Sequence, residues 1–118
     1  MISANINRQT RRNVYRRDGF RCVLCDDARR LQIHHIVPRG QGGPGENEMN
    51  LVTLCPRCHA LIHGVDVDGL ARAFGEQFSP DYLTQVVTEY VSDLYAERVC
   101  TPWNPWSPAS FDWRREGY

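Results

Sequence analysis

The stretch that decides the fold runs from residue 22 to residue 63 and contains CVLC (22–25), HH (34–35) and CPRCHALIH (55–63). It holds four of the chain's five cysteines and all four of its histidines. Thiolates and imidazoles are the ligands that zinc and related divalent metals prefer. The sequence therefore predicts that this region is organised around metal rather than around a large apolar core.

The bulk composition limits the class of protein. A length of 118 residues predicts one domain, with an appended element at most. We divide it into a core at 1–66 and a helical extension at 67–118, packed on the same domain or on a partner. No apolar run long enough to span a membrane is present. Residues 1–13 lack the apolar core of a secretory signal, so we expect a cytoplasmic protein.

Charge is divided unevenly along the chain, although the formal net charge is zero. Residues 1–60 carry ten Arg against five acidic residues, whereas residues 61–118 carry four Arg against nine. A basic half can still present a face that attracts phosphate. All fourteen basic residues are Arg, which binds phosphate through two nitrogens, but codon bias in a GC-rich genome is the simpler explanation of this composition.

Two Cys-x-x-Cys pairs, Cys22/Cys25 and Cys55/Cys58, predict a closed structural zinc site. Each turn presents two sulfurs, and two such turns complete a tetrahedral site with no open position. One alternative is a redox-active pair, which would need a thioredoxin-like context that this sequence lacks; another is a set of unrelated thiols. The odd cysteine count argues against a disulfide framework.

The histidines predict a second, open metal site. His59 and His63 are four residues apart and share a helix face. His34 on a strand would supply a third nitrogen, while His35 would point away and remain available for proton transfer. The alternatives are a purely structural cluster, a His63 favoured only by the helix dipole, and a His59 that ligates the structural zinc instead.

The periodicity of the apolar residues and the positions of capping, Gly and Pro residues predict the helices and strands. We expect a helix at 8–17, a short strand at 20–25, a strand at 31–36, a loop at 38–47, an extended segment at 50–54 and a helix at 56–63. Asp68 is a candidate cap for a further helix. The strongest helix spans 79–99, with Ser79 as its cap, Pro80 in its first turn and an apolar stripe along one face.

These motifs together resemble the HNH endonucleases, whose core is the α+β ββα-metal fold, also called the His-Me finger. The matching sequences are CVLC (22–25), HHIVPRG (34–40) and NLVTLCPRCH (50–59), within about residues 12–63. The resemblance implies a ββα core stabilised by a structural zinc bound to four cysteines, with flanking helices.

The resemblance also implies roles for single residues. His35 would be the general base, Asn50 would orient the base and its loop, and His59 would ligate a catalytic metal. The position of His34 is often Asp in this family, and a His there is similar to the nuclease-toxin branch, in which His63 fits a further ligand. An all-nitrogen site suits Zn, Ni or Co, whereas Mg prefers oxygen, so the identity of the cation (Mg, Mn, Ni, Co or Zn) stays open.

The implied reaction is hydrolysis of DNA phosphodiester bonds, by nicking or by double-strand cleavage. Arg39 and Arg57 lie beside the motif and are candidates for neutralising the scissile phosphate; they are equally well explained as solvated surface charges. The basic helix would contact flanking phosphates without reading sequence, through Arg12, Arg16 and Arg17.

Two other functions compete with the enzyme. A non-catalytic zinc-stapled DNA-binding or adaptor module would be expected to lack His35 or Asn50, and both are present. An accessory subunit of a bacteriophage packaging or restriction complex would use the C-terminal helix and the Trp/Pro tail (Trp103, Trp106, Trp113) to dock onto a larger protein or a second copy. A tail that covers the domain's own core is the simpler interpretation. Cys100 is expected to be a buried thiol.

Overall fold

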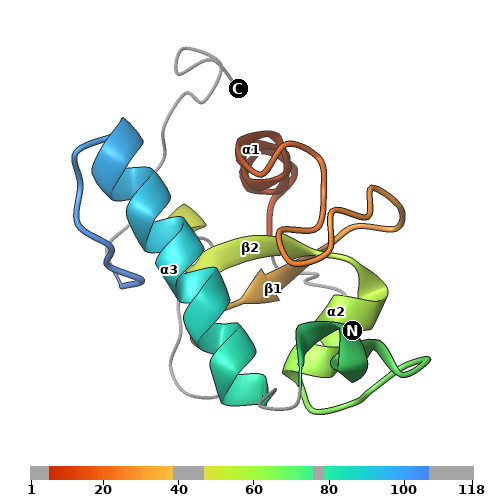
Figure 1. Ribbon diagram of the computed structural model, residues 1–118. Coiled ribbons are helices and arrows are strands. Elements are labelled where there is room, and N and C mark those ends of the chain that lie inside the picture. Colours follow the sequence, from red (N-terminus) through yellow and green to blue (C-terminus); the bar gives the residue numbers. More distant parts are fainter. Residues whose placement is uncertain (1–5, 39–46, 76–78, 107–118) are drawn as a thin grey trace.

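The computed structural model describes residues 6–38, 47–75 and 79–106, which form a small α+β domain (Figure 1). The elements, in chain order, are α1 (Arg8–Arg17), β1 (Gln32–His35), the 3-10 helix η2 (Glu48–Asn50), β2 (Leu51–Leu54), α2 (Pro56–Ile62), the 3-10 helix η3 (Leu70–Phe74) and α3 (Pro80–Arg98). A two-stranded sheet followed directly by α2 agrees with the ββα-metal arrangement.

The two strands form an antiparallel hairpin whose register decides which side chains share a face. Gln32 pairs with Leu54, Ile33 with Thr53, His34 with Val52 and His35 with Leu51. Because side chains alternate along a strand, Gln32 and His34 share one face of the sheet, and Ile33 and His35 share the other.

Each face of the sheet has its own core. Val52 and Leu54 pack with residues of α2 and α3 in the larger cluster, whereas Ile33 and Leu51 pack with Val14 of α1 in the smaller one. The side chains of Val52, Leu54, Leu51 and Val14 are fully buried.

Helix α2 begins where the sequence predicts. Cys55 caps it, its sulfur accepting a hydrogen bond from the backbone N–H of Cys58 at 3.4 Å, and Pro56 occupies the first turn. The helix ends at Ile62, with His63 at the C-cap and Gly64 following at a φ of 92°. A residue with a side chain would be strained at that φ, so Gly64 is well suited to end the helix.

Helix α3 confirms the strongest of the periodic patterns. The Ser79 hydroxyl accepts from the N–H of Tyr82 at 3.1 Å, and Pro80 follows it. The predicted stripe provides the buried residues Leu83, Val87, Val91 and Tyr95. They pack with Leu61 and Ile62 of α2 in the larger core, so α3 lies alongside α2.

A buried polar network joins α1, η2 and α3. Arg17 makes an ion pair with Asp18 at 2.8 Å and donates to the carbonyls of Glu48 at 2.7 Å and Leu51 at 2.6 Å. From α3, the Tyr90 hydroxyl donates to Asp18 at 2.8 Å. Since both side chains of the ion pair are fully buried, these contacts satisfy charges that would otherwise be costly in the interior.

The start of the tail packs on η2. Trp103 donates its indole N–H to the carbonyl of Met49 at 2.6 Å, and the Asn47 amide donates to the carbonyls of Asn104 and Pro105. Trp103 thus packs against the domain's own core, while Trp106 is 57% exposed. Trp113 lies outside the described residues.

Three local expectations are wrong. Residues 20–25 form turns rather than a strand, because the chain must fold back to bring Cys22 and Cys25 together. Asp68 has a φ of 58° and does not cap η3, which follows Gly69 instead. Cys100 is exposed, since it lies beyond the end of α3.

Within the described ranges, no helix is long and apolar enough to cross a membrane.

Candidate functional site

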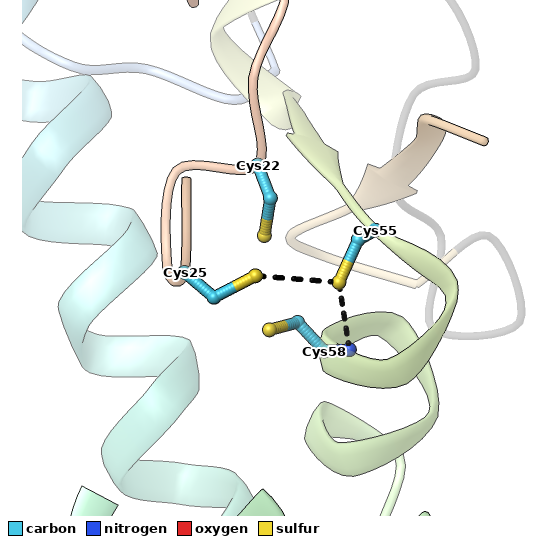
Figure 2. Close-up of side chains that lie close together, drawn as sticks. All are labelled: Cys22, Cys25, Cys55 and Cys58. Atoms are coloured by element: carbon cyan, nitrogen blue, oxygen red, sulfur yellow. Dashed lines mark hydrogen bonds between the residues drawn. The ribbon is translucent and has the colours of Figure 1, made fainter. Parts of the chain in front are cut away.

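Four cysteine sulfurs converge beside the sheet, as the sequence predicts (Figure 2). Cys22 and Cys25 come from the turn after α1, and Cys55 and Cys58 come from the end of β2 and the first turn of α2. All four Sγ atoms lie within 4.8 Å of one another, and those of Cys25 and Cys55 are 3.5 Å apart. A tetrahedral zinc with bonds of about 2.3 Å requires sulfurs about 3.8 Å apart, so this group fits zinc.

Backbone hydrogen bonds hold the first Cys-x-x-Cys turn in place. The N–H of Asp26 donates to the carbonyl of Cys22 at 2.9 Å, which closes the turn. The N–H of Val23 donates to the carbonyl of Thr53 at 3.1 Å, which attaches the turn to β2. The first Cys-x-x-Cys turn is therefore fixed to the same hairpin that carries His34.

The thiols strongly influence each other's protonation. A hydrogen bond from Cys58 lowers the pKa of Cys22 to about 5, and the same bond raises the pKa of Cys58. Burial, with the neighbouring thiols, raises the pKa of Cys25 to about 11. One thiolate thus forms readily and disfavours the others, and a bound dication would relieve this repulsion.

Three histidines form a second cluster on the sheet face that α2 covers. His34 projects from β1, His59 from α2 and His63 from its C-cap. One nitrogen of each lies within 4.8 Å of the others, and the ring centroids are 5.1–5.3 Å apart. His34 is buried, His59 is half-buried and His63 is exposed, so the cluster opens to solvent on the His63 side.

Burial keeps two of these imidazoles neutral. It lowers the pKa of His34 to about 3, and the neighbouring histidines lower it further. Burial, followed by the charge of His63, lowers the pKa of His59 to about 4. A neutral imidazole has a lone pair for a metal, so the three nitrogens fit a divalent cation.

Gln32 also belongs to this site, and sequence reasoning did not identify it. Its side-chain oxygen lies 2.6 Å from Nδ1 of His59. The sequence did contain a signal for Gln32, because a residue two positions before His34 on a strand must lie on the same face of the sheet.

His35 and Asn50 occupy the rim of the hairpin. The strand alternation places His35 on the face opposite to His34, where it is half-buried. Asn50 is fully buried; its side-chain oxygen accepts from the N–H of Val37 at 2.7 Å, and its amide donates to the Val37 carbonyl at 3.1 Å. Asn50 therefore fixes the backbone two residues beyond His35.

The predicted DNA-contacting arginines fall into different environments. Arg12 is exposed, and Arg16 and Arg57 are half-buried. Arg39 lies outside the described residues. The expectation that Arg17 contacts DNA is wrong. Arg17 is 1% exposed, and its guanidinium is engaged in the ion pair and backbone contacts described above, so it cannot reach a phosphate.

Comparison with known families supports the expected resemblance. The family model described as HNH endonuclease matches residues 22–64, which include both the group of four cysteines and the histidine cluster. The HNH resemblance is therefore confirmed for this segment.

Two curated relatives show partial similarity. Anaredoxin of Nostoc sp. is 29% identical over 58 residues, covering 48% of this chain and 75% of the relative. The type IV methyl-directed restriction enzyme EcoKMcrA of Escherichia coli (strain K12) is 42% identical over 33 residues, covering 28% of this chain and only 12% of the enzyme. No solved structure matches.

Proposed function

We propose that this chain is a metal-dependent DNA endonuclease that hydrolyses phosphodiester bonds. The observation that carries the proposal is the convergence of one nitrogen each from His34, His59 and His63, which lie within 4.8 Å of one another. His34 comes from β1, the strand that also carries His35. The HNH match over residues 22–64 and the similarity to a restriction enzyme support the same reaction class.

His34, His59 and His63 would hold the catalytic cation. When bound, such a cation would act as a Lewis acid that stabilises negative charge on the phosphate. Three nitrogen ligands favour Ni, Co or Zn over Mg. The exposed position of His63 leaves this site accessible to a large substrate, in contrast to the thiol group, in which three of the four cysteines are buried.

His35 would act as the general base that takes a proton from the attacking water. This requires a neutral imidazole, whose free lone pair accepts the proton. Asn50 would serve as a positioning residue, because its two hydrogen bonds to Val37 hold the segment that follows His35. A base must lie within hydrogen-bonding reach of the proton it removes, so this rigidity matters for rate.

DNA would be held by phosphate contacts rather than by base contacts. Arg12 and Arg16 are one helical turn apart on α1, which places them on the same side of the helix. Together with Arg57 and Arg39, they would give salt-sensitive binding with little sequence preference.

The test is incubation of supercoiled plasmid with the zinc-loaded protein and added Mg, Mn, Ni, Co or Zn, comparing wild type with His35→Ala. We expect cleavage by the wild type alone, and the ratio of nicked to linear product distinguishes the strand modes. DNA binding without cleavage under every metal would instead support the non-catalytic module. Cleavage that appears only with a packaging or restriction partner, or only in a homodimer, would assign the chain as a subunit.

A further inference from the structure

We propose that Gln32 is a positioning residue that selects the metal-binding nitrogen of His59. Gln32 and His34 are two residues apart on β1 and share the sheet face toward α2. The Gln32 side-chain oxygen approaches Nδ1 of His59 to 2.6 Å, which links the strand to the helix across the cluster. The inference rests on the proposed histidine metal site.

The identity of the two atoms fixes the direction of the hydrogen bond. A carboxamide oxygen can only accept, so Nδ1 of His59 must carry the hydrogen and donate it. A neutral imidazole has one N–H, and the other nitrogen, Nε2, therefore keeps its lone pair. Gln32 thus leaves Nε2 as the His59 nitrogen with a lone pair available to a cation.

The same contact also fixes the orientation of the ring. The His59 ring is one corner of a nearly equilateral triangle, with its centroid 5.3 Å from that of His34 and 5.1 Å from that of His63, which are themselves 5.2 Å apart. A rotated ring would move its nitrogen away from the group of three, and the other tautomer would place the hydrogen on Nε2 and remove its lone pair. Hydrogen bonds of this kind to metal-ligating histidines commonly change metal affinity by about 10–100-fold when removed.

Ni²⁺ is the probe for this proposal, titrated calorimetrically into tag-free protein whose thiol site is loaded with zinc. We expect Gln32→Leu, which removes the acceptor, to bind Ni²⁺ about 10–100-fold more weakly than wild type. Gln32→Glu retains an acceptor oxygen and should stay within a few-fold of wild type. Gln85→Leu is the matched control, because Gln85 lies on the exposed face of α3 and bonds only Glu89 among the contacts described. His34→Ala should abolish the titration and so identify the site.

A second measurement keeps the proposal testable if Gln32→Leu is poorly folded. Long-range proton–nitrogen NMR spectra of the wild type, with zinc on the four cysteines and no metal at the histidines, report which His59 nitrogen carries the hydrogen. We expect the hydrogen on Nδ1 in the wild type. A hydrogen on Nε2, or an unchanged Ni²⁺ affinity in folded Gln32→Leu, would overturn the proposal.

These outcomes are separable from failure of the nuclease function. A wild type that binds Ni²⁺ in a Gln32-dependent manner but cleaves no DNA would contradict the proposed function and leave this inference standing. A wild type that cleaves DNA, with a Gln32→Leu variant of unchanged Ni²⁺ affinity, would contradict this inference alone.

Discussion

Asn50 holds the backbone of Val37 from both sides, accepting from its N–H at 2.7 Å and donating to its carbonyl at 3.1 Å. Val37 lies two residues beyond β1, and Asn50 is the last residue of η2, directly before β2. The Asn50 carbonyl also accepts from the N–H of Ile36 at 2.8 Å. The exit of β1, directly after His35, is thereby fixed to the start of β2.

Replacing Asn50 should test this link. Asn50→Ala leaves the N–H and the carbonyl of Val37 without their partner, which should lower the free energy of unfolding by about 1–3 kcal/mol. Urea unfolding measures this change, and the plasmid assay should show a large loss of cleavage in protein that is still folded. Asn50→Asp keeps the acceptor but places a carboxylate against the Val37 carbonyl, so it should not restore stability; full recovery would contradict the assigned hydrogen bonds.

His35→Ala should separate catalysis from folding. His35 lies outside both the thiol group and the cluster of His34, His59 and His63, so the variant should retain its zinc and its fold while losing cleavage. Zinc content and circular dichroism provide the structural controls. Unchanged activity in His35→Ala would contradict its role as the base.

Cys55→Ser should lose zinc and unfold the domain. Zinc binding to four thiolates contributes on the order of 10–16 kcal/mol in small zinc modules, which is comparable to the whole stability of a domain of this size. Cys55 also caps α2, so both effects act on the same helix. Cys100→Ser is the matched control, because Cys100 is exposed and lies outside the thiol group. Metal analysis and thermal unfolding give the comparison; a folded Cys55→Ser protein would show that zinc is not required for the fold.

Arg17 and Arg12 should behave oppositely, although both lie on α1. Arg17→Met leaves Asp18 buried without its ion-pair partner and should cost about 3–5 kcal/mol of stability. Arg12→Ala should leave stability nearly unchanged because Arg12 is exposed. Removing one phosphate contact at Arg12 should weaken DNA binding and reduce the slope of log K against log salt by about 0.9. Denaturation curves measure the stability of each variant, and binding curves at several salt concentrations measure its DNA affinity. A destabilised Arg12→Ala would contradict the assignment of a structural role to Arg17 and a DNA-contacting role to Arg12.

The metal-free histidine cluster should make stability dependent on pH. The folded protein holds the pKa of His34 at about 3, whereas an unfolded histidine titrates near 6.5, so between these values the unfolded state binds more protons. Stability should therefore be unaffected by His34 above about pH 6.5 and should fall as the pH decreases toward 3. The contribution of this single group is at most about 1.4 kcal/mol per pH unit. Urea unfolding of His34→Leu should show a shallower dependence than wild type, and an identical slope would contradict the assignment.

The sequence by itself determined which cysteines and which histidines cluster, and most of the helices and strands. Metal ligation depends on residue type and short spacing, so the pairs Cys22/Cys25 and Cys55/Cys58 and the spacing of His59 and His63 were sufficient to predict where nitrogen and sulfur would gather. Helix α3 could also be predicted from the sequence, because capping by Ser79 and apolar residues repeated with the helical period are local properties.

Only the tertiary structure decided which similar residues have different roles. Arg12 and Arg17 look alike in the sequence, but α3, more than sixty residues later, brings Tyr90 and Tyr95 against the Arg17–Asp18 pair and buries it. Gln32 looked like an ordinary polar strand residue until the hairpin register and α2 placed it against His59. In both cases the role depends on contacts between segments distant in the chain, which spacing along a single segment does not contain.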